Sequence, residues 1–156
     1  MIWALLLLAQ AAVPTQIERG EALFFGSAHA CGGCHALKGK GTAVGPDLRD
    51  VARLSPHGIA LTIKSTVTQY VQVVKLKDGR TFPSMPAKGD QLYDLSKTPP
   101  EPVQAPAADV STQPNNGWKH PPSTQTFTSQ ELADIVAYIR FAGANNRGPV
   151  SPDDMP

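Results

Sequence analysis

The residues with the most reactive side chains stand together near the start of the chain. Cys31 and Cys34 are its only two cysteines, two glycines separate them, and His35 follows directly. Two thiols at this spacing can add across the two vinyl groups on one edge of a porphyrin, and the adjacent imidazole can then ligate the iron. The motif Cys-Gly-Gly-Cys-His therefore predicts one covalently attached haem c, with His35 as an iron ligand.

The same residues fit other chemistry less well. A thioredoxin-like dithiol stands at a strand-to-helix junction of a βαβ unit, and no such pattern surrounds the two cysteines. A structural zinc site needs four ligands, and a disulfide across so few residues would close a tiny loop and stabilise little. The other histidines, which do not form a second closely spaced ligand pair, are His29, His57 and His120.

Composition limits the classes of function. A chain of 156 residues suits a single domain, and 15 prolines with 13 glycines predict much irregular chain. The formal net charge of +1 gives no indication of a nucleic-acid or anionic-membrane partner. No catalytic set is recognisable beyond the haem motif, so we expect a protein that is not an enzyme.

The first residues have the pattern of an export signal. The apolar run from Ile2 to Ala9 is too short to cross a bilayer, which needs roughly 20 residues. Ala9-Gln10-Ala11 is an Ala-x-Ala cleavage site, although no Lys or Arg precedes the run, and a buried N-terminal helix is the alternative. We expect residues 1–12 to be a signal peptide, leaving a periplasmic or otherwise extracytoplasmic protein with no stable membrane anchor.

Helices dominate the elements expected for the domain over residues 13–143. Apolar residues at spacings of three and four predict helices over 16–26 and 55–67. A third helix is expected over 128–143, where Thr128 and Glu131 form a capping box and Gly143 can end the helix. The fold class is therefore predicted to be mainly α.

Two further segments are expected to be irregular or extended. Asp78-Gly79, in a run rich in β-branched residues, predicts a small β-hairpin, and residues 91–95 predict a short strand. Seven prolines between residues 98 and 122 predict a wrapping loop that sustains neither a helix nor a central strand. Residues 144–156 are expected to be a flexible C-terminal tail.

Taken together, these features resemble the class I cytochromes c, a family of monohaem c-type cytochromes. The resemblance covers roughly residues 16–86 and 127–143, and it leaves residues 88–126 as a long proline-rich insertion. It implies a helical fold around one haem. The matching features are Gly20 and Phe24 in the first helix, the Cys31–His35 motif, Gly-Pro-x-Leu at 45–48, a loop methionine at Met85, and the amphipathic segment 131–143.

The resemblance also implies roles for matching residues. Gly20 should let the first helix cross the last one closely, near Tyr138. The carbonyl of Pro46 should accept a hydrogen bond from the second ring nitrogen of His35, which would fix the tautomer of that ring and raise its basicity. The cofactor-binding residues predicted on this basis are Cys31, Cys34, His35, Pro46 and Met85.

The second axial ligand has three alternatives. Met85 lies between prolines in a loop, as distal methionines of the family do, and a thioether raises the reduction potential relative to a second histidine. His120 competes, since it lies eight residues before Thr128, about where many family members have their distal ligand. An open or water-bound position is the third alternative, and Met85 is the favoured one.

The resemblance implies a function in electron transfer. We expect an extracytoplasmic electron carrier, or an electron-transfer subunit, that cycles between ferric and ferrous iron. Its partner would be a redox protein such as a dehydrogenase, an oxidase or another cytochrome. The alternative is a haem-based ligand-binding or sensor domain, or a small peroxidase, with an open distal site.

Overall fold

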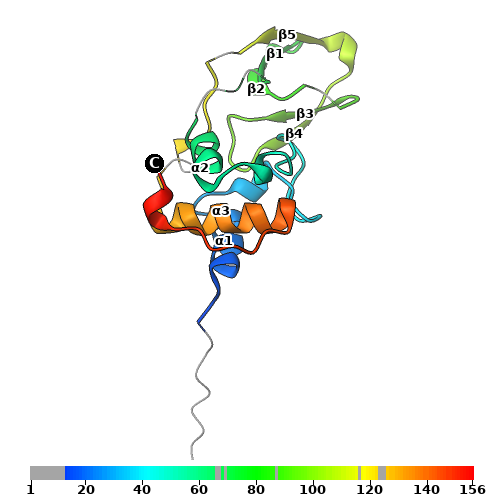
Figure 1. Cartoon of the computed structure of the whole chain (residues 1–156). Helices are drawn as coiled ribbons and strands as arrows, with labels where there is room; N and C mark the ends of the chain where they lie inside the picture. The colour runs from blue at the N-terminus through cyan, green and yellow to red at the C-terminus, as the bar shows by residue number, and fades with distance from the viewer. Residues whose placement is uncertain (1–12, 66–67, 69, 87, 116, 123–125) are drawn as a thin grey trace, which may run out of the picture.

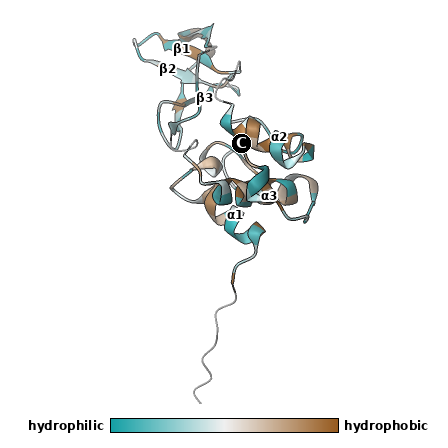
Figure 2. Cartoon of the chain, turned by 60° about the vertical axis from the view of Figure 1, so that its left-hand side comes forward, coloured by the Kyte–Doolittle hydropathy of each residue, from teal (hydrophilic) through white to brown (hydrophobic). Residues whose placement is uncertain are grey.

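The computed structural model has helices at one end and strands at the other, in both views (Figures 1 and 2). We call the helical end the helical lobe and the strands β1 to β5 the sheet lobe. The chain enters the sheet lobe after the second helix and returns before the third. The structure describes residues 13–65, 68, 70–86, 88–115, 117–122 and 126–156.

The first helix, α1 (Gln16–Phe25), begins at a capping box. The Thr15 side chain accepts from the backbone of Glu18, whose side chain in turn accepts from the backbone of Thr15. This arrangement satisfies two backbone donors that a helix start leaves without partners. The helix buries Gly20 and Phe24 and ends at Gly26, which confirms the predicted element.

The third helix, α3 (Ser129–Ala144), forms the centre of the core. Its own capping box joins Thr128 and Glu131, as predicted. Every residue from Leu132 to Ile139 is buried, because the sheet-proximal helix α2, the helix α1 and the C-terminal segment all contact α3. The apolar members of this stretch form the main hydrophobic core together with Phe24 and Ile59.

Gly143 does not end α3, contrary to the prediction. The helix continues to Ala144, and Asn145 caps it in the left-handed conformation with a φ of 53°. Gly143 lies where α3 meets the chain near Ala52, since a Cβ on Gly143 would come within 2.4 Å of the Ala52 Cβ. Close packing, not helix termination, explains this glycine.

Helix α2 (Pro56–Lys64) follows the predicted N-terminal pattern. The Ser55 side chain accepts a hydrogen bond from the backbone of Gly58, and Pro56 occupies the first turn. Ile59 and Ala60 are buried against the core. The helix ends earlier than the expected residue 67, which itself lies outside the described residues.

The five strands in the described part of the chain make the fold mixed α/β, which corrects the expectation of a mainly α protein. The predicted hairpin at Asp78-Gly79 is present between the antiparallel strands β1 and β2, and the predicted strand at 91–95 is β3. The three-stranded sheet has the order β2-β1-β5, and β3 pairs with β4. The strands are β1 (Gln72–Leu76), β2 (Thr81–Ser84), β3 (Gln91–Asp94), β4 (Glu101–Gln104) and β5 (Val110–Pro114).

The proline-rich segment was expected to be a loop, but it contains β4 and β5. Both are edge strands: β5 lies outside β1, and β4 belongs to a two-stranded sheet. Pro102 and Pro114 are therefore tolerated, because an edge strand has one side on which no ladder donor is needed. A second small core fills this lobe and includes Val74, Phe82 and Leu92.

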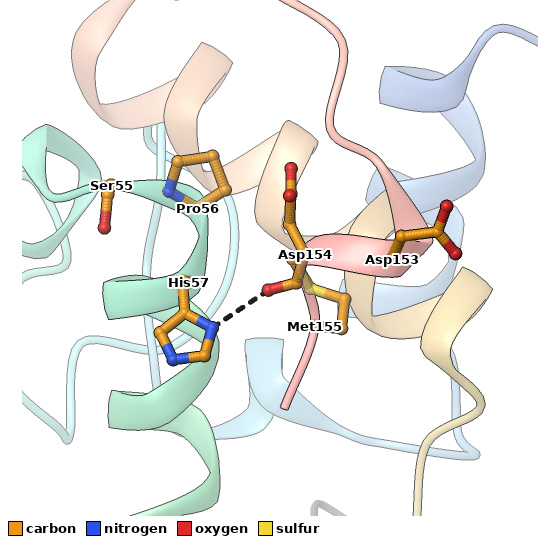
Figure 3. Close-up of a pocket in the computed structure, with 6 residues that line it drawn as sticks. All are labelled: Ser55, Pro56, His57, Asp153, Asp154 and Met155. Carbon is orange, nitrogen blue, oxygen red and sulfur yellow. Dashed lines mark hydrogen bonds between the residues drawn. The ribbon is translucent and has the colours of Figure 1, made fainter.

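The C-terminal segment packs on the helical lobe, whereas the sequence predicted a flexible tail over 144–156. Val150 is 3% exposed, and its backbone exchanges two hydrogen bonds with the side chain of Gln16. Further along, Nδ1 of His57 lies 3.0 Å from the carbonyl oxygen of Asp154 (Figure 3). Buried apolar surface and these long-range hydrogen bonds hold the segment in place.

None of the helices in the described part of the chain has the length and apolar character to cross a bilayer. The predicted signal peptide, residues 1–12, lies outside the described residues.

The crossing of α1 and α3 depends on Gly20. A Cβ at this position would lie 1.9 Å from the carbonyl oxygen of Asp134 and 2.8 Å from the Cβ of Tyr138. The close crossing expected from the sequence is therefore present, and the rings of Phe24 and Tyr138 pack beside it with centroids 5.4 Å apart.

We expect Gly20→Ala to lower the free energy of unfolding by at least about 2 kcal/mol, even though Ala is the better helix former. The added methyl group must push the two helices apart. Denaturant titration of the variant beside the parent measures the loss. Gly117→Ala is the control, because its Cβ would meet nothing nearer than 3.9 Å and should change stability by less than about 0.5 kcal/mol. Equal stability of the two variants would contradict the claim that α1 and α3 approach too closely at Gly20 for a side chain.

A second link between α1 and α3 is the ion pair of Arg19 with the buried Asp134. Nε and Nη2 of Arg19 lie 2.7 and 2.9 Å from the two carboxylate oxygens, and Gln130 donates a third hydrogen bond. Burial by itself would raise the pKa of Asp134, but the hydrogen bonds from Arg19 and Gln130 outweigh it and lower the pKa below the usual 3.8. The ionised form therefore stabilises the fold.

We expect Asp134→Asn to cost about 1–3 kcal/mol of unfolding free energy at pH 7. The contribution of the charge is complete above the unfolded-state pKa near 3.8 and is lost as the pH falls through the lower folded value. The difference between parent and variant should therefore shrink in acid, as measured by unfolding at pH 7 and pH 3. Asp47→Asn, which removes an exposed partner of Arg49, should change stability less. A loss that does not depend on pH would argue against the ion pair.

Candidate functional site

The two cysteines lie on one short turn. The 3₁₀ helix η1 (Cys31–Gly33) begins after Ala30, and the backbone amides of Cys34 and His35 both donate to the carbonyl of Cys31. Both thiols are free and half-buried. Burial raises the pKa of Cys31 to about 11 and raises that of Cys34 as well, so both sulfurs stay protonated near neutral pH.

The imidazole of His35 is held by the loop that follows it. Its Nδ1 lies 2.8 Å from the carbonyl oxygen of Pro46, as the sequence predicted, and the Nδ1–H tautomer donates this hydrogen bond. The Nε2 lone pair then remains available to a metal. Burial lowers the pKa of His35, while the hydrogen bond to Pro46 raises it to a smaller extent, so the ring is neutral at pH 7.

Gly45 provides the space in which this ring lies. A Cβ on Gly45 would come within 2.7 Å of Cε1 and 3.0 Å of Nδ1 of His35. The backbone amides of Val44 and Gly45 both donate to the carbonyl of Cys34, at 3.0 and 2.7 Å. The segment Val44–Pro46 therefore lies directly against the motif, and Gly45, named in the sequence analysis as part of Gly-Pro-x-Leu, makes room for the ring.

Met85 lies at the end of β2, beside the loop. Its side chain packs on the buried residues Val44, Val71 and Leu95, and Trp118 packs on the same cluster. We call Val44, Val71, Leu95, Met85, Tyr93 and Trp118 the distal cluster. A hydrogen bond from Nζ of Lys88 to the carbonyl of Ala43, at 3.0 Å, joins the sheet lobe to the same loop.

His120 also lies beside this cluster. The centroids of its ring and the Trp118 ring are 5.3 Å apart. Burial lowers the pKa of His120, and the charge of a protonated His35 lowers it further. His120 thus lies beside a cluster that contains Val44, a residue of the loop that follows the motif, although 85 positions separate it from His35 in the sequence.

The other two histidines considered in the sequence lie elsewhere. His29 is buried against Phe127, with ring centroids 4.3 Å apart, and His57 contacts the C-terminal segment. Phe24 is part of the helical core. Phe25 packs against that core and also lies against the motif, because a Cβ on Gly32 would come within 2.3 Å of the Phe25 ring. Neither histidine lies in the distal cluster.

Comparison with known proteins gives a direct assignment. A family model described as cytochrome c matches residues 17–97, just over half of the chain. The chain belongs to the cytochrome c family. The match contains the motif, the Gly-Pro segment and Met85, and it ends before His120 and α3. No curated protein matches the chain at a significant level.

As a member of this family, the cytochrome carries a covalently bound haem c with iron and is of the electron-carrier type. The residues present fit this group. Two free thiols lie on one turn, and the neighbouring imidazole has its Nδ1 engaged by Pro46, so that only Nε2 can ligate a metal. Proteins of this family exchange electrons with redox partners and are typically extracytoplasmic.

We expect Gly45→Ala to disturb this haem site without unfolding the cytochrome. The added methyl group must displace the His35 ring and lengthen its hydrogen bond to Pro46, and the loss of such a support costs roughly tenfold or more in metal affinity. The visible spectrum should show more high-spin haem, and the reduction potential should rise because the imidazole becomes a weaker donor. Gly117→Ala is the matched control, and an unchanged spectrum in Gly45→Ala would contradict the expectation.

Proposed function

We propose that this cytochrome is an extracytoplasmic monohaem electron carrier, or the electron-transfer subunit of a larger complex, and not an enzyme. When bound, the haem supplies one-electron chemistry by changing between its ferric and ferrous states. In this proposal Cys31 and Cys34 form the thioether links, and His35 is the proximal ligand. The observation that carries it is the His35 ring, oriented by Pro46 directly behind two free thiols.

The surroundings of the ring suit electron transfer. The hydrogen bond to Pro46 keeps His35 in one tautomer and one orientation, which limits how much the site must rearrange when the iron gains or loses an electron. Apolar side chains of the distal cluster, such as Val44 and Val71, are almost fully buried and would exclude water. Exclusion of water favours the ferrous state, which carries less charge.

The assignment of Met85 as the distal ligand of the iron remains a prediction from the sequence. It lies within the segment that matches the family and packs on Val44 next to the motif. Either Met85 or His120 would complete a six-coordinate iron that binds no substrate. The alternative function, a sensor or peroxidase, requires an open distal position.

Export is part of the same proposal. Residues 1–12 would direct the chain out of the cytoplasm and be removed, and the partner would be a dehydrogenase, an oxidase or another cytochrome. The mass of the mature protein, produced in a host with an intact maturation system, tests the cleavage. A mature N-terminus near Ala12 supports the proposal, and retention of the apolar segment contradicts it.

The covalent links give the sharpest test of the proposed function. After extraction with acidic acetone, the parent should keep its haem, each of Cys31→Ala and Cys34→Ala should keep it through one link, and the double variant should lose it entirely. Each single variant controls for the other, because one thioether remains. Colourless parent protein after extraction would overturn the proposal.

Measurements on the same preparations distinguish an electron carrier from a protein with an open distal position. We expect the parent to be reduced and reoxidised reversibly, to be low-spin in both states, and not to bind carbon monoxide readily. Binding of carbon monoxide by the ferrous parent, with a high-spin spectrum, would favour the sensor or peroxidase instead.

A further inference from the structure

The ends of three strands meet at the side of the sheet lobe that faces the haem motif. Gln72, the first residue of β1, is paired with Ser84 of β2 on one side and with Pro114 of β5 on the other. The amide of Asn115 donates to the carbonyl of Val71 at 3.0 Å, which extends the pairing by one step. The sheet lobe therefore begins and ends at the same place.

The pairing of β1 with β5 decides where the segment after the sheet lobe begins. Because Pro114 at the end of β5 is paired with Gln72 at the start of β1, the chain leaves the sheet lobe next to the point where it entered. His120 then stands eight residues before Thr128, the N-cap of α3. Met85 also lies at this end, directly after Ser84, so the fold brings both residues to the same region.

A series of contacts links His120 to the motif. Trp118 packs on the distal cluster, which includes Val44, and Val44 donates to the carbonyl of Cys34. The His120 ring lies against Trp118, with centroids 5.3 Å apart.

Met85 has the contacts of a packing residue. Its side chain joins Val71 and Leu95 in the distal cluster, where a flexible thioether fills space. Its backbone is fixed, because the hydroxyl of the fully buried Ser84 donates to the Met85 carbonyl at 2.8 Å and accepts from the amide of Tyr93 at 3.3 Å.

We propose that His120, and not Met85, is the second axial ligand of the haem iron, and that Met85 forms part of the apolar wall beside it. The inference rests on the proposed function, since it presupposes the haem held by Cys31, Cys34 and His35. Two imidazoles would then coordinate the iron. A second histidine gives a lower reduction potential than a methionine does.

Two matched variants test the assignment. His120→Ala should convert the low-spin spectrum to a high-spin one, allow the ferrous protein to bind carbon monoxide, and regain the low-spin spectrum when imidazole is added. Met85→Leu, which preserves the apolar volume, should keep the low-spin spectrum of the parent. Magnetic circular dichroism of the oxidised parent should show no sulfur-to-iron charge-transfer band. Such a band in the parent, lost in Met85→Leu, would overturn the proposal, and so would a low-spin His120→Ala without added imidazole.

A third variant keeps the proposal testable if His120→Ala does not fold. His120→Met should create the sulfur-to-iron band and raise the reduction potential above that of the parent, whereas no change in either would count against His120. Extraction with acidic acetone shows whether a failed test refutes the proposed function or only the assignment of the ligand. Absence of bound haem in the parent refutes the proposed function itself, while stable haem with a methionine spectrum refutes only the ligand assignment.

Discussion

The hydrogen bond between the His35 imidazole and the Pro46 carbonyl is the constraint on which the site depends. A histidine directly after two cysteines is tethered at its backbone, but its ring could still rotate. The 2.8 Å bond to Pro46, with Gly45 leaving no side chain behind the ring, fixes both its orientation and its tautomer. The backbone amides of Val44 and Gly45 donate hydrogen bonds to the Cys34 carbonyl, and these bonds hold the loop with Pro46 against the motif. Contacts within the protein therefore orient the His35 ring so that its Nε2 can ligate a metal.

The helical lobe supplies the rigid base for this loop. Gly20 allows the backbones of α1 and α3 to approach, and the Arg19–Asp134 pair joins the same two helices. The motif follows α1 after a few residues, so its position is set by this crossing. The C-terminal segment adds to the same base through Val150 and Gln16. Packing far from the cysteines thereby determines where they lie.

The sheet lobe combines strands β1 and β2 with strands from the insertion at 88–126. Because β1 and β5 are paired side by side, the chain leaves and re-enters the helical lobe at adjacent points. The closed lobe has its own small core around Val74 and Leu92, and it contributes the distal cluster at its base. The insertion thus supplies one wall of the site and places Trp118 and His120 against it.

The sequence by itself determined what depends on neighbouring residues: the thiols and imidazole of the motif, the capping boxes of α1 and α3, the Asp78-Gly79 hairpin and the turn that carries Pro46. These follow from covalent spacing and local backbone preferences. Only the tertiary structure decided that the segment with Pro102 and Pro114 forms edge strands, that Val150 is buried, and that His120 lies against Trp118 beside the distal cluster. Pairing partners and burial come from distant parts of the chain, and no local pattern around those residues encodes them.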